Sequence, residues 1–463
     1  MKRKIISLSI ILFGAIGCPA YATKTAGSMD LSLLAEKLGV EKRLPLSDIT
    51  SVKEENKGYA INLNDALRGG IAHSYEVEAS VYHQESFNQN MRAAMGALLM
   101  KLDFRISGGV GASETQAQAL AKTYRREEAL TMTQPLIDYA AYQEYQRQSM
   151  LSNSADVELM DTKAKNMLEV ANAFLATLQS KLVVTMGEEY ELLLKELEDY
   201  MKARAAGGGA SQADFNRVKS RVSNLRSALT DARASAKVNA RNLERLIGDL
   251  PAWLDMSGSA AISMPESMQD ARSAAMSQNM EIVKARKDAE AVQREIETSR
   301  ARFFPKLTVE VSATRTLNSG GTPGFMNDNK VMLVLTQPLF AAGSDLAQLR
   351  AVVARLNESQ AKIKLAESKL GQEIEASFDN MSSASERYDS VLDELESNKK
   401  VVTAFKEQLT SSNRSLLDVL DAYQRLHQSR LDLVQLFVVN MQTRFRIAYL
   451  TGQLSDEEFT KEK

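Results

Sequence analysis

The side chains that most often carry catalysis or bind metal ions are scarce in this chain. It contains three histidines, His73, His83 and His427, and one cysteine, Cys18. His73 and His83 are 83 − 73 = 10 residues apart and do not share one face of a helix, so we predict that both lie at the surface. No glycine-rich phosphate loop and no set of nucleophile, base and orienting group can be recognised. We therefore predict a protein that is not an enzyme and that uses no cofactor and no metal.

The most distinctive charged residues lie near the C-terminal end of the chain. Arg414, Asp418 and Asp421 occur in the run Arg-Ser-Leu-Leu-Asp-Val-Leu-Asp-Ala, which begins a predicted helix. The aspartates are 421 − 418 = 3 residues apart, so they share a helix face about one turn apart. Taken alone, each aspartate is best interpreted as a solvated residue at a helix start, where the helix dipole favours negative charge. Any further chemistry depends on the elements around them.

Those elements occur twice in the chain. Thr133-Gln134-Pro135-Leu136 recurs as Thr336-Gln337-Pro338-Leu339, an offset of 336 − 133 = 203, and Asp214 recurs as Asp418, an offset of 418 − 214 = 204. Offsets that hold within an element and change only across loops indicate a duplicated fold. The predicted organisation is a signal peptide (1–22), an N-terminal extension of unknown role (23–60), a first repeat (61–250), a linker (251–262), a second repeat (263–454) and a C-terminal tail (455–463).

Each repeat contains segments with the two-residue period of a β-strand. Leu102, Phe104 and Ile106 alternate with Asp103 and Arg105. In the second repeat, 307–314 alternates in the same way, with Glu310 among its polar residues. We predict that the glycine-rich segments 108–111 and 319–324 are turns and that return strands occupy about 129–133 and 331–336. One apolar and one polar face indicate a strand between two environments.

Two interpretations of these four strands remain open. One is a soluble hairpin pair whose apolar face covers a core. The other is a membrane barrel, with Asp103, Arg105 and Glu310 inside and the apolar face toward lipid. Small closed barrels begin near eight strands, whereas three copies would supply about 12. The helices beside the strands are much too long to cover so small a sheet, which favours the barrel.

Long helices follow each return strand. We predict that Pro135 and Pro338 lie at the strand-to-helix turns, in the first helical turn, where proline is tolerated. The helical pattern then continues to about Ala206 and, in the second repeat, from about Ser344 to Thr410. Such lengths, about 100 Å each, predict coiled coils, although an ordinary antiparallel bundle is the alternative. The next helix of the first repeat carries a heptad seam made of Phe215, Val218, Val222, Leu225, Leu229, Ala232 and Ala236.

The N-terminus has the form of a secretory signal. Three basic residues precede an apolar run at 5–16, and Ala20 and Ala22 form a small-x-small cleavage site. Acylation of Cys18 is the alternative. We predict that no segment beyond the signal is long and apolar enough to be a transmembrane helix. With 57 basic and 59 acidic residues, the composition does not indicate a nucleic-acid partner.

The chain resembles the TolC-like outer-membrane factors, the export ducts of Gram-negative bacteria. The resemblance covers about 61–454 and rests on Arg302-Phe303-Phe304-Pro305-Lys306-Leu307, on Thr336-Gln337-Pro338-Leu339-Phe340 and on the run at 414–422. It implies a mainly α fold with a small membrane β part. Four strands per protomer would give a 12-stranded trimeric barrel in outer-membrane lipid, above a periplasmic tunnel of long coiled-coil helices. The implied partners are a periplasmic adaptor (membrane fusion) protein and an inner-membrane ABC or proton-driven pump.

The resemblance also assigns a periplasmic gate. Asp418 and Asp421 match the positions that form carboxylate rings at the constriction of the family, Arg414 matches an arginine that bonds an aspartate across the coiled coils, and Asp214 occupies the place of that partner. A tyrosine that often helps to close the constriction is absent near Leu409. The expected function is a duct for type I protein secretion or multidrug efflux. The alternative is a soluble periplasmic coiled-coil scaffold or adaptor without a pore.

Overall fold

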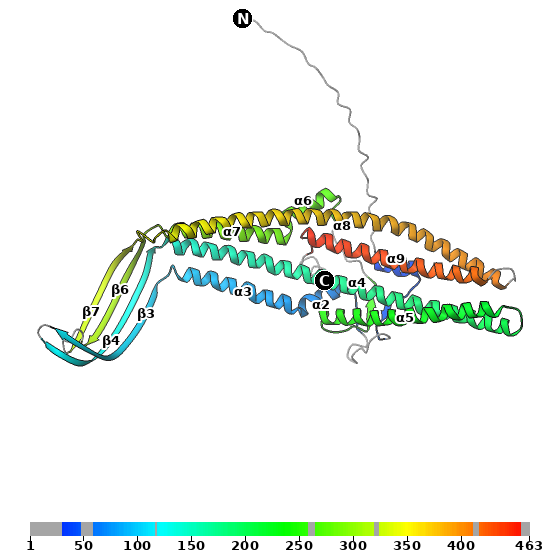
Figure 1. The fold of residues 1–463 in the computed structure, drawn as a ribbon, viewed down its shortest axis with the longest axis horizontal. Helices are drawn as coiled ribbons and strands as arrows, with labels where there is room; N and C mark the ends of the chain where they lie inside the picture. The colour runs from blue at the N-terminus through cyan, green and yellow to red at the C-terminus, as the bar shows by residue number, and fades with distance from the viewer. Residues whose placement is uncertain are drawn as a thin grey trace, which may run out of the picture.

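The protein is strongly elongated, with a sheet at one end and long helices along the rest (Figure 1). The structure is a computed structural model that describes residues 30–47, 59–115, 118–257, 264–318, 324–410 and 416–454. Within these ranges the side chains of 112–123 and 409–410 are not described.

The same series of elements occurs twice, as the constant offsets predict. Corresponding helices have nearly equal lengths: 68 and 67 residues for the longest pair, and 36 and 35 for the pair that follows. The first series is α2 (Leu63–His73), α3 (Tyr75–Gly96), β3 (Lys101–Thr115), β4 (Gln118–Ile137), α4 (Tyr139–Ala206) and α5 (Gln212–Ile247). The second is α6 (Met268–Gln278), α7 (Met280–Ala301), β6 (Lys306–Leu317), β7 (Phe325–Thr336), α8 (Ser344–Thr410) and α9 (Leu416–Leu450).

The two hairpins join into one antiparallel four-stranded sheet with the order β3-β4-β6-β7. Directly opposed residues share a face, so one row across the sheet contains Leu102, Met132, Val311 and Val331. The neighbouring row, on the other face, contains Asp103, Thr131, Ser312 and Lys330. The register therefore gives all four strands one apolar face, with charged and polar side chains opposite, as the alternation predicts.

The prediction of a turn at 108–111 is wrong, because β3 continues through this segment to Thr115. The glycines make room for two large side chains of β4. A Cβ atom at Gly108 would lie 3.1 Å from the Tyr124 hydroxyl, and one at Gly111 would lie 3.0 Å from Nε of Arg125. Glycine interrupts the apolar period without breaking the ladder, so the strands are longer than the period indicates. The second glycine-rich segment lies almost wholly outside the described residues.

The placement of the prolines in the first helical turn is also wrong. Pro135 is part of β4, opposite Thr308, and a register shift follows before Ile137. The helix α4 begins only at Tyr139, and its N-cap is Asp138, whose carboxylate accepts a 2.9 Å hydrogen bond from the Ala141 N–H. Pro338 follows the end of β7 but precedes the start of α8 at Ser344. Pro135 thus lies two residues before the end of its strand and Pro338 two residues after the end of its own, and other residues begin the helices.

The helix α4 is the central element of the helical part. It contacts α3, α5, α7 and α9, and its middle third supplies buried side chains such as Phe174, Leu178 and Leu182 to the main core. Within the described residues it alone contains an 18-residue window apolar enough to cross a membrane by composition, with a mean hydropathy of 1.2. This qualifies the prediction that no such helix exists. Because 67% of the window is buried inside the protein, α4 is a core helix.

The described residues of the segments predicted as an extension (30–47 and 59–60) and a linker (251–257) belong to the folded body. A short helix, α1 (Leu31–Leu38), is followed by β1 (Arg43–Pro45), which pairs with β5 (Trp253–Asp255). The strand β2 (Ala60–Ile61) pairs with the other edge of β5. These three strands form a small sheet beside the middle of the helices, and their apolar side chains join the main core. Sequence reasoning missed them because strands of two or three residues show no measurable period.

Candidate functional site at the helical tip

The end of the molecule opposite the sheet is built from two helix pairs, α4 with α5 and α8 with α9 (Figure 1). The heptad seam predicted in α5 is confirmed, since Val218, Val222, Leu229 and Ala236 are buried. At the tip the first two of these pack with Tyr190 and three further apolar residues of α4, and also with Leu420 of α9. This small core fixes where the charged residues of α5 and α9 lie.

One ion pair at the tip joins the two repeats. Nη2 of Arg221 on α5 lies 3.7 Å from a carboxylate oxygen of Asp421 on α9. The two side chains are 44% and 58% exposed, so the pair contributes less than about 1 kcal/mol and is weakened by salt. A contact of this kind can hold two helix pairs together without preventing their separation.

The other predicted gate residues are placed less completely. Asp214 lies in the first turn of α5, where its carboxylate is 3.5 Å from Nη1 of Arg217. Asp418 is exposed in the first turn of α9, where the helix dipole favours negative charge. Arg414 lies outside the described residues, so its contact with Asp214 stays a prediction. The cleavage residues Ala20 and Ala22 also lie outside them.

Arg221 was not singled out from the sequence, although the repeat contains a signal for it. At an offset of 204, Asp421 corresponds to 421 − 204 = 217, which is Arg217, and Arg221 corresponds to 221 + 204 = 425, which is Arg425. The position that matches Asp421 thus holds a base in the first repeat, and Arg221 lies about one helical turn beyond it. Only the packing of α5 against α9 shows which of these bases approaches the acid.

Above the tip, a buried contact joins α4 to α9. The rings of Tyr190 and His427 stack with their centroids 4.7 Å apart. Burial and, to a smaller extent, Arg430 lower the pKa of His427 to about 4, and Glu189 opposes the shift. Nη1 of Arg430 lies 2.7 Å from the Glu189 carboxylate. The neutral imidazole is therefore part of the packing. By contrast, His73 and His83 are exposed, as predicted.

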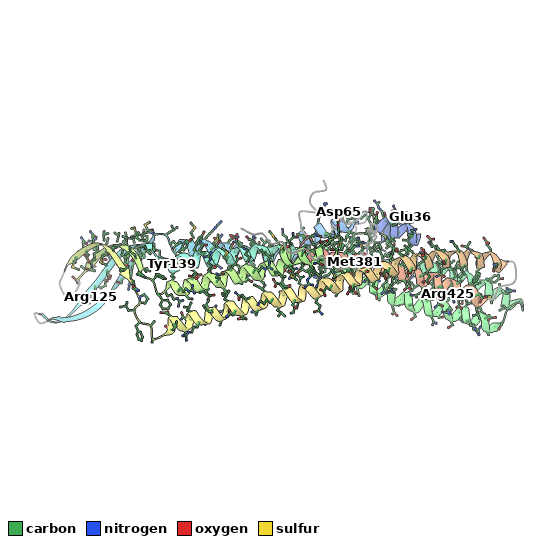
Figure 2. All side chains as sticks on the ribbon, turned by 90° about the horizontal axis from the view of Figure 1, so that it is seen from above. Glu36, Asp65, Arg125, Tyr139, Met381 and Arg425 are labelled. Atoms are coloured by element: carbon green, nitrogen blue, oxygen red, sulfur yellow. The ribbon has the colours of Figure 1, made fainter. Side chains whose placement is uncertain are left out.

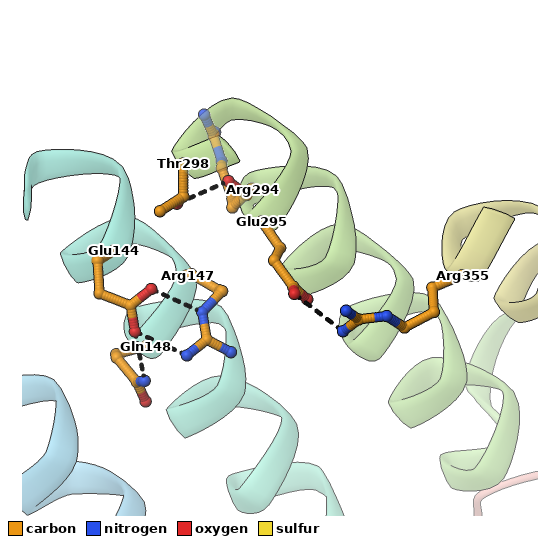
Figure 3. A network of polar contacts seen from close by, with 7 residues as sticks. All are labelled: Glu144, Arg147, Gln148, Arg294, Glu295, Thr298 and Arg355. Atoms are coloured by element: carbon orange, nitrogen blue, oxygen red, sulfur yellow. Dashed lines mark hydrogen bonds and ion pairs between the residues drawn. The ribbon is translucent and has the colours of Figure 1, made fainter. Parts of the chain in front are cut away.

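A second polar network ties the helices together near the sheet, and Figure 3 shows it. Arg147 donates two hydrogen bonds, of 2.8 and 2.7 Å, to the carboxylate of Glu144, and these bonds lower the pKa of Glu144 against the effect of its burial. Arg355 on α8 bonds Glu295 on α7 at 2.9 Å. Glu144, Arg147, Glu295 and Arg355 each have a partner of opposite sign. The arrangement stabilises helix packing and offers no reactive group.

Comparisons with known proteins identify the class of this molecule. A family model described as outer membrane efflux protein matches residues 271–453. The chain is 20% identical over 419 residues to the alkaline protease secretion protein AprF of Pseudomonas aeruginosa, which covers 86% of each chain. It is 22% identical to the proteases secretion protein PrtF of Dickeya chrysanthemi, over 86% of this chain and 90% of PrtF. The solved CmeC outer membrane channel of Campylobacter jejuni shares the fold, with a TM-score of 0.74 at 12% identity over 99% of this chain and 96% of CmeC.

The family match, the relatives and the shared fold together indicate a TolC-like outer-membrane factor. As such it is an outer-membrane export duct, of the class that serves type I secretion and efflux, and it is a transport protein. The scaffold alternative has no use for a sheet with an exposed apolar face, which this outer-membrane factor carries at one end of its helices.

Proposed function

We propose that three copies of the chain form one continuous duct, with a 12-stranded barrel in the outer membrane and a periplasmic helical tunnel. The observation that carries the proposal is the sheet. It has only four strands, and its outer strands β3 and β7 each pair on one side alone among the described residues. Unpaired strand edges are avoided in stable proteins, and closure removes them. Three sheets joined edge to edge give 3 × 4 = 12 strands.

The two faces of the sheet support this assignment of lipid and lumen. Phe104, Val331 and Leu333 are 66%, 76% and 65% exposed on the apolar face, which is a poor arrangement in water. Asp103, Arg105 and Glu310 lie on the opposite face. Charge on the lipid side of a barrel costs about 2–4 kcal/mol per residue at the midplane, so the charged face belongs inside.

The helical tip would then be the gate. In a trimer, Asp418 and Asp421 form two rings of three carboxylates about one helical turn apart, and such rings favour cations in a narrow pore. The pair between Arg221 and Asp421, and the predicted pair between Arg414 and Asp214, connect the α4–α5 coil to the α8–α9 coil. Opening requires these connections to separate.

The cargo and partners follow from the comparisons as proposals. AprF and PrtF are named for protease secretion, which favours type I secretion of a protein through a periplasmic adaptor and an ABC transporter. The second candidate is efflux of small molecules with a proton-driven pump, which the efflux name of the family favours. The duct itself serves either process, because the pump selects the cargo.

Single-channel recording of the purified protein in a planar bilayer tests the duct and its gate. We expect small, cation-selective conductance steps that become larger in Arg414→Ala. Asp418→Ala combined with Asp421→Ala should remove the cation preference. Arg425→Ala, an exposed arginine on the same helix, is the matched control and should behave like the wild type. Unchanged selectivity in the double variant would place the constriction elsewhere, and a folded protein without pore activity would overturn the duct.

A further inference from the structure

The N-terminal segment 30–47 is anchored to the first repeat. Its strand β1 pairs with β5, which follows α5, and Leu44 lies directly opposite Leu254. Nε of Arg43 also lies 3.3 Å from the Asp255 carboxylate. Leu31, Leu34, Ala35 and Leu38 of α1 are all buried, so one whole face of this short helix is packed into the core. The segment is thus a built part of the fold.

The C-terminal end of α1 is held by the second repeat. The last four carbonyls of a helix have no partner within it. The N–H groups of Gly39 and Val40 bond two of them, those of Glu36 and Ala35. The remaining two accept from side chains of other helices. Lys399 on α8 donates a 2.8 Å bond to the Lys37 carbonyl, and Arg430 on α9 donates a 3.0 Å bond to the Leu38 carbonyl.

The positive charges of Lys399 and Arg430 lie at the C-terminus of α1, where they are electrostatically favourable. A helix C-terminus carries partial negative charge, which favours cations placed at it. Burial and the nearby Arg430 and Lys37 lower the pKa of Lys399, while Glu396 on its own helix opposes the shift. Arg430 bonds Glu189 on α4 as well, so one guanidinium connects α1, α9 and α4. Its side chain is only 14% exposed.

The held end of α1 lies close to the proposed gate. Arg430 is 430 − 421 = 9 residues from Asp421 on the same helix, which corresponds to about 14 Å. The stacked pair of Tyr190 and His427 lies between them. Figure 2 shows Glu36 of α1 between Met381 and Arg425 along the helices, with Arg425 nearer the tip. Any separation of the α8–α9 coil from the α4–α5 coil at this height has to stretch or break the bonds to α1.

We propose that residues 30–47 act as a strap, which is anchored on the first repeat through β1 and β5 and holds the α8–α9 coil in place through Lys399 and Arg430. The strap opposes opening of the tip from a site outside the gate. The inference rests on the proposed gated duct. The strap holds because the last two carbonyl groups of α1 accept hydrogen bonds from two cations of the α8–α9 coil.

Two substitutions weaken the strap by different routes. Lys399→Ala removes the ammonium that bonds the Lys37 carbonyl and leaves the gate residues unchanged. Gly39→Val leaves every charge in place but strains the helix cap, because Gly39 has a φ of +72°. The space around its Cβ position is open, so the strain comes from the backbone and not from a steric clash. Lys400→Ala is the matched control, since Lys400 is the next residue on α8 and is exposed, as Lys399 is.

The readout is the ratio of open to closed time in single-channel recordings, with trimer melting measured alongside. We expect the ratio to rise about fivefold in Lys399→Ala, the factor for one net hydrogen bond, and to rise in Gly39→Val too. The control should match the wild type. Variants that melt earlier but gate like the wild type would overturn the strap and leave only a structural role. A wild type without pores would instead overturn the proposed duct, so the two failures are distinguishable.

Discussion

At the scale of single residues, the tip combines weak and strong contacts in a way that suits a gate. The ion pair between Arg221 and Asp421 is largely solvated and contributes little. Less than two turns further along α9, His427 stacks on Tyr190, and burial together with Arg430 lowers its pKa, so the ring is neutral. The exposed charges can part cheaply, whereas the buried ring cannot accept a proton without a cost. Stability near the tip should therefore depend on pH through this one ring.

We predict that acid destabilises the helical part through His427. Its pKa is about 4 in the folded protein and about 6.5 when unfolded, so between these values the unfolded chain binds more protons. Stability is therefore complete above pH 6.5 and falls as the pH is lowered toward 4. Partial solvent contact limits the loss to about 2 kcal/mol. Thermal unfolding at pH 7 and pH 4.5 measures it.

The variant His427→Gln should show a smaller difference in unfolding midpoint between the two pH values. His83→Gln serves as the control, because His83 is half-exposed and lies on α3 beside Glu158. An equal pH effect in the wild type and in His427→Gln would assign the acid sensitivity to carboxylates instead.

At the scale of elements, prediction from sequence is accurate where proline or glycine residues mark the end of a helix or strand. The end of α4 at Ala206, before a glycine run, and both bounds of α8 agree with the prediction, whereas α4 begins only at Tyr139, after Pro135. The strands were underestimated because Gly108 and Gly111 interrupt the period while their neighbours cover them. Contacts between distant segments were out of reach. Nothing local in Arg221 indicates that a residue 421 − 221 = 200 positions away will approach it, and nothing in 30–47 shows that its helix end meets α8 and α9.

Equivalent helix ends in the two repeats yield the next prediction. Gly248 and Gly452 follow α5 and α9, both have positive φ values, and they are 452 − 248 = 204 residues apart. At Gly452 a Cβ atom would lie 2.5 Å from the backbone carbonyl oxygen of Gln278, which cannot move aside easily. We expect Gly452→Ala to lower the free energy of unfolding by about 2–4 kcal/mol, from backbone strain and overpacking together.

Gly208→Ala separates the two contributions. Gly208 has a φ of +72°, close to the +71° of Gly452, but nothing lies within 4 Å of its Cβ position. Gly208→Ala should lower the free energy of unfolding by only about 1 kcal/mol, from backbone strain alone. Chemical denaturation of both variants supplies the comparison. Equal losses would show that the contact with Gln278 relaxes and that backbone conformation alone requires glycine.

At the scale of the whole molecule, the two ends perform different physical tasks on one repeated plan. The sheet exposes an apolar face, and among the described residues neither of its outer strands pairs on its free side, which is the reason for proposing further copies. The helices bury their apolar side chains within the chain, and the tip carries exposed charged residues such as Arg221 and Asp421. The duplicated order places one hairpin and one coiled-coil pair from each repeat side by side. Assembly in the membrane and gating below it can therefore be tested separately.

We predict that the outward face of the sheet decides insertion into the membrane. Phe104→Arg places a charge on the apolar face, at a cost of about 2–4 kcal/mol per copy near the midplane, and three copies should largely prevent assembly. Thr131→Arg places the same side chain on the opposite face, next to Asp103 and Ser312 in the register, where a water-filled lumen would accommodate it. Separation of membranes by density and detection of heat-labile trimers measure both variants. Retention of Thr131→Arg in the outer membrane together with loss of Phe104→Arg is the expected result. The reverse result would mean that the face with Thr131 contacts lipid. Equal retention of the two variants would mean that neither face does.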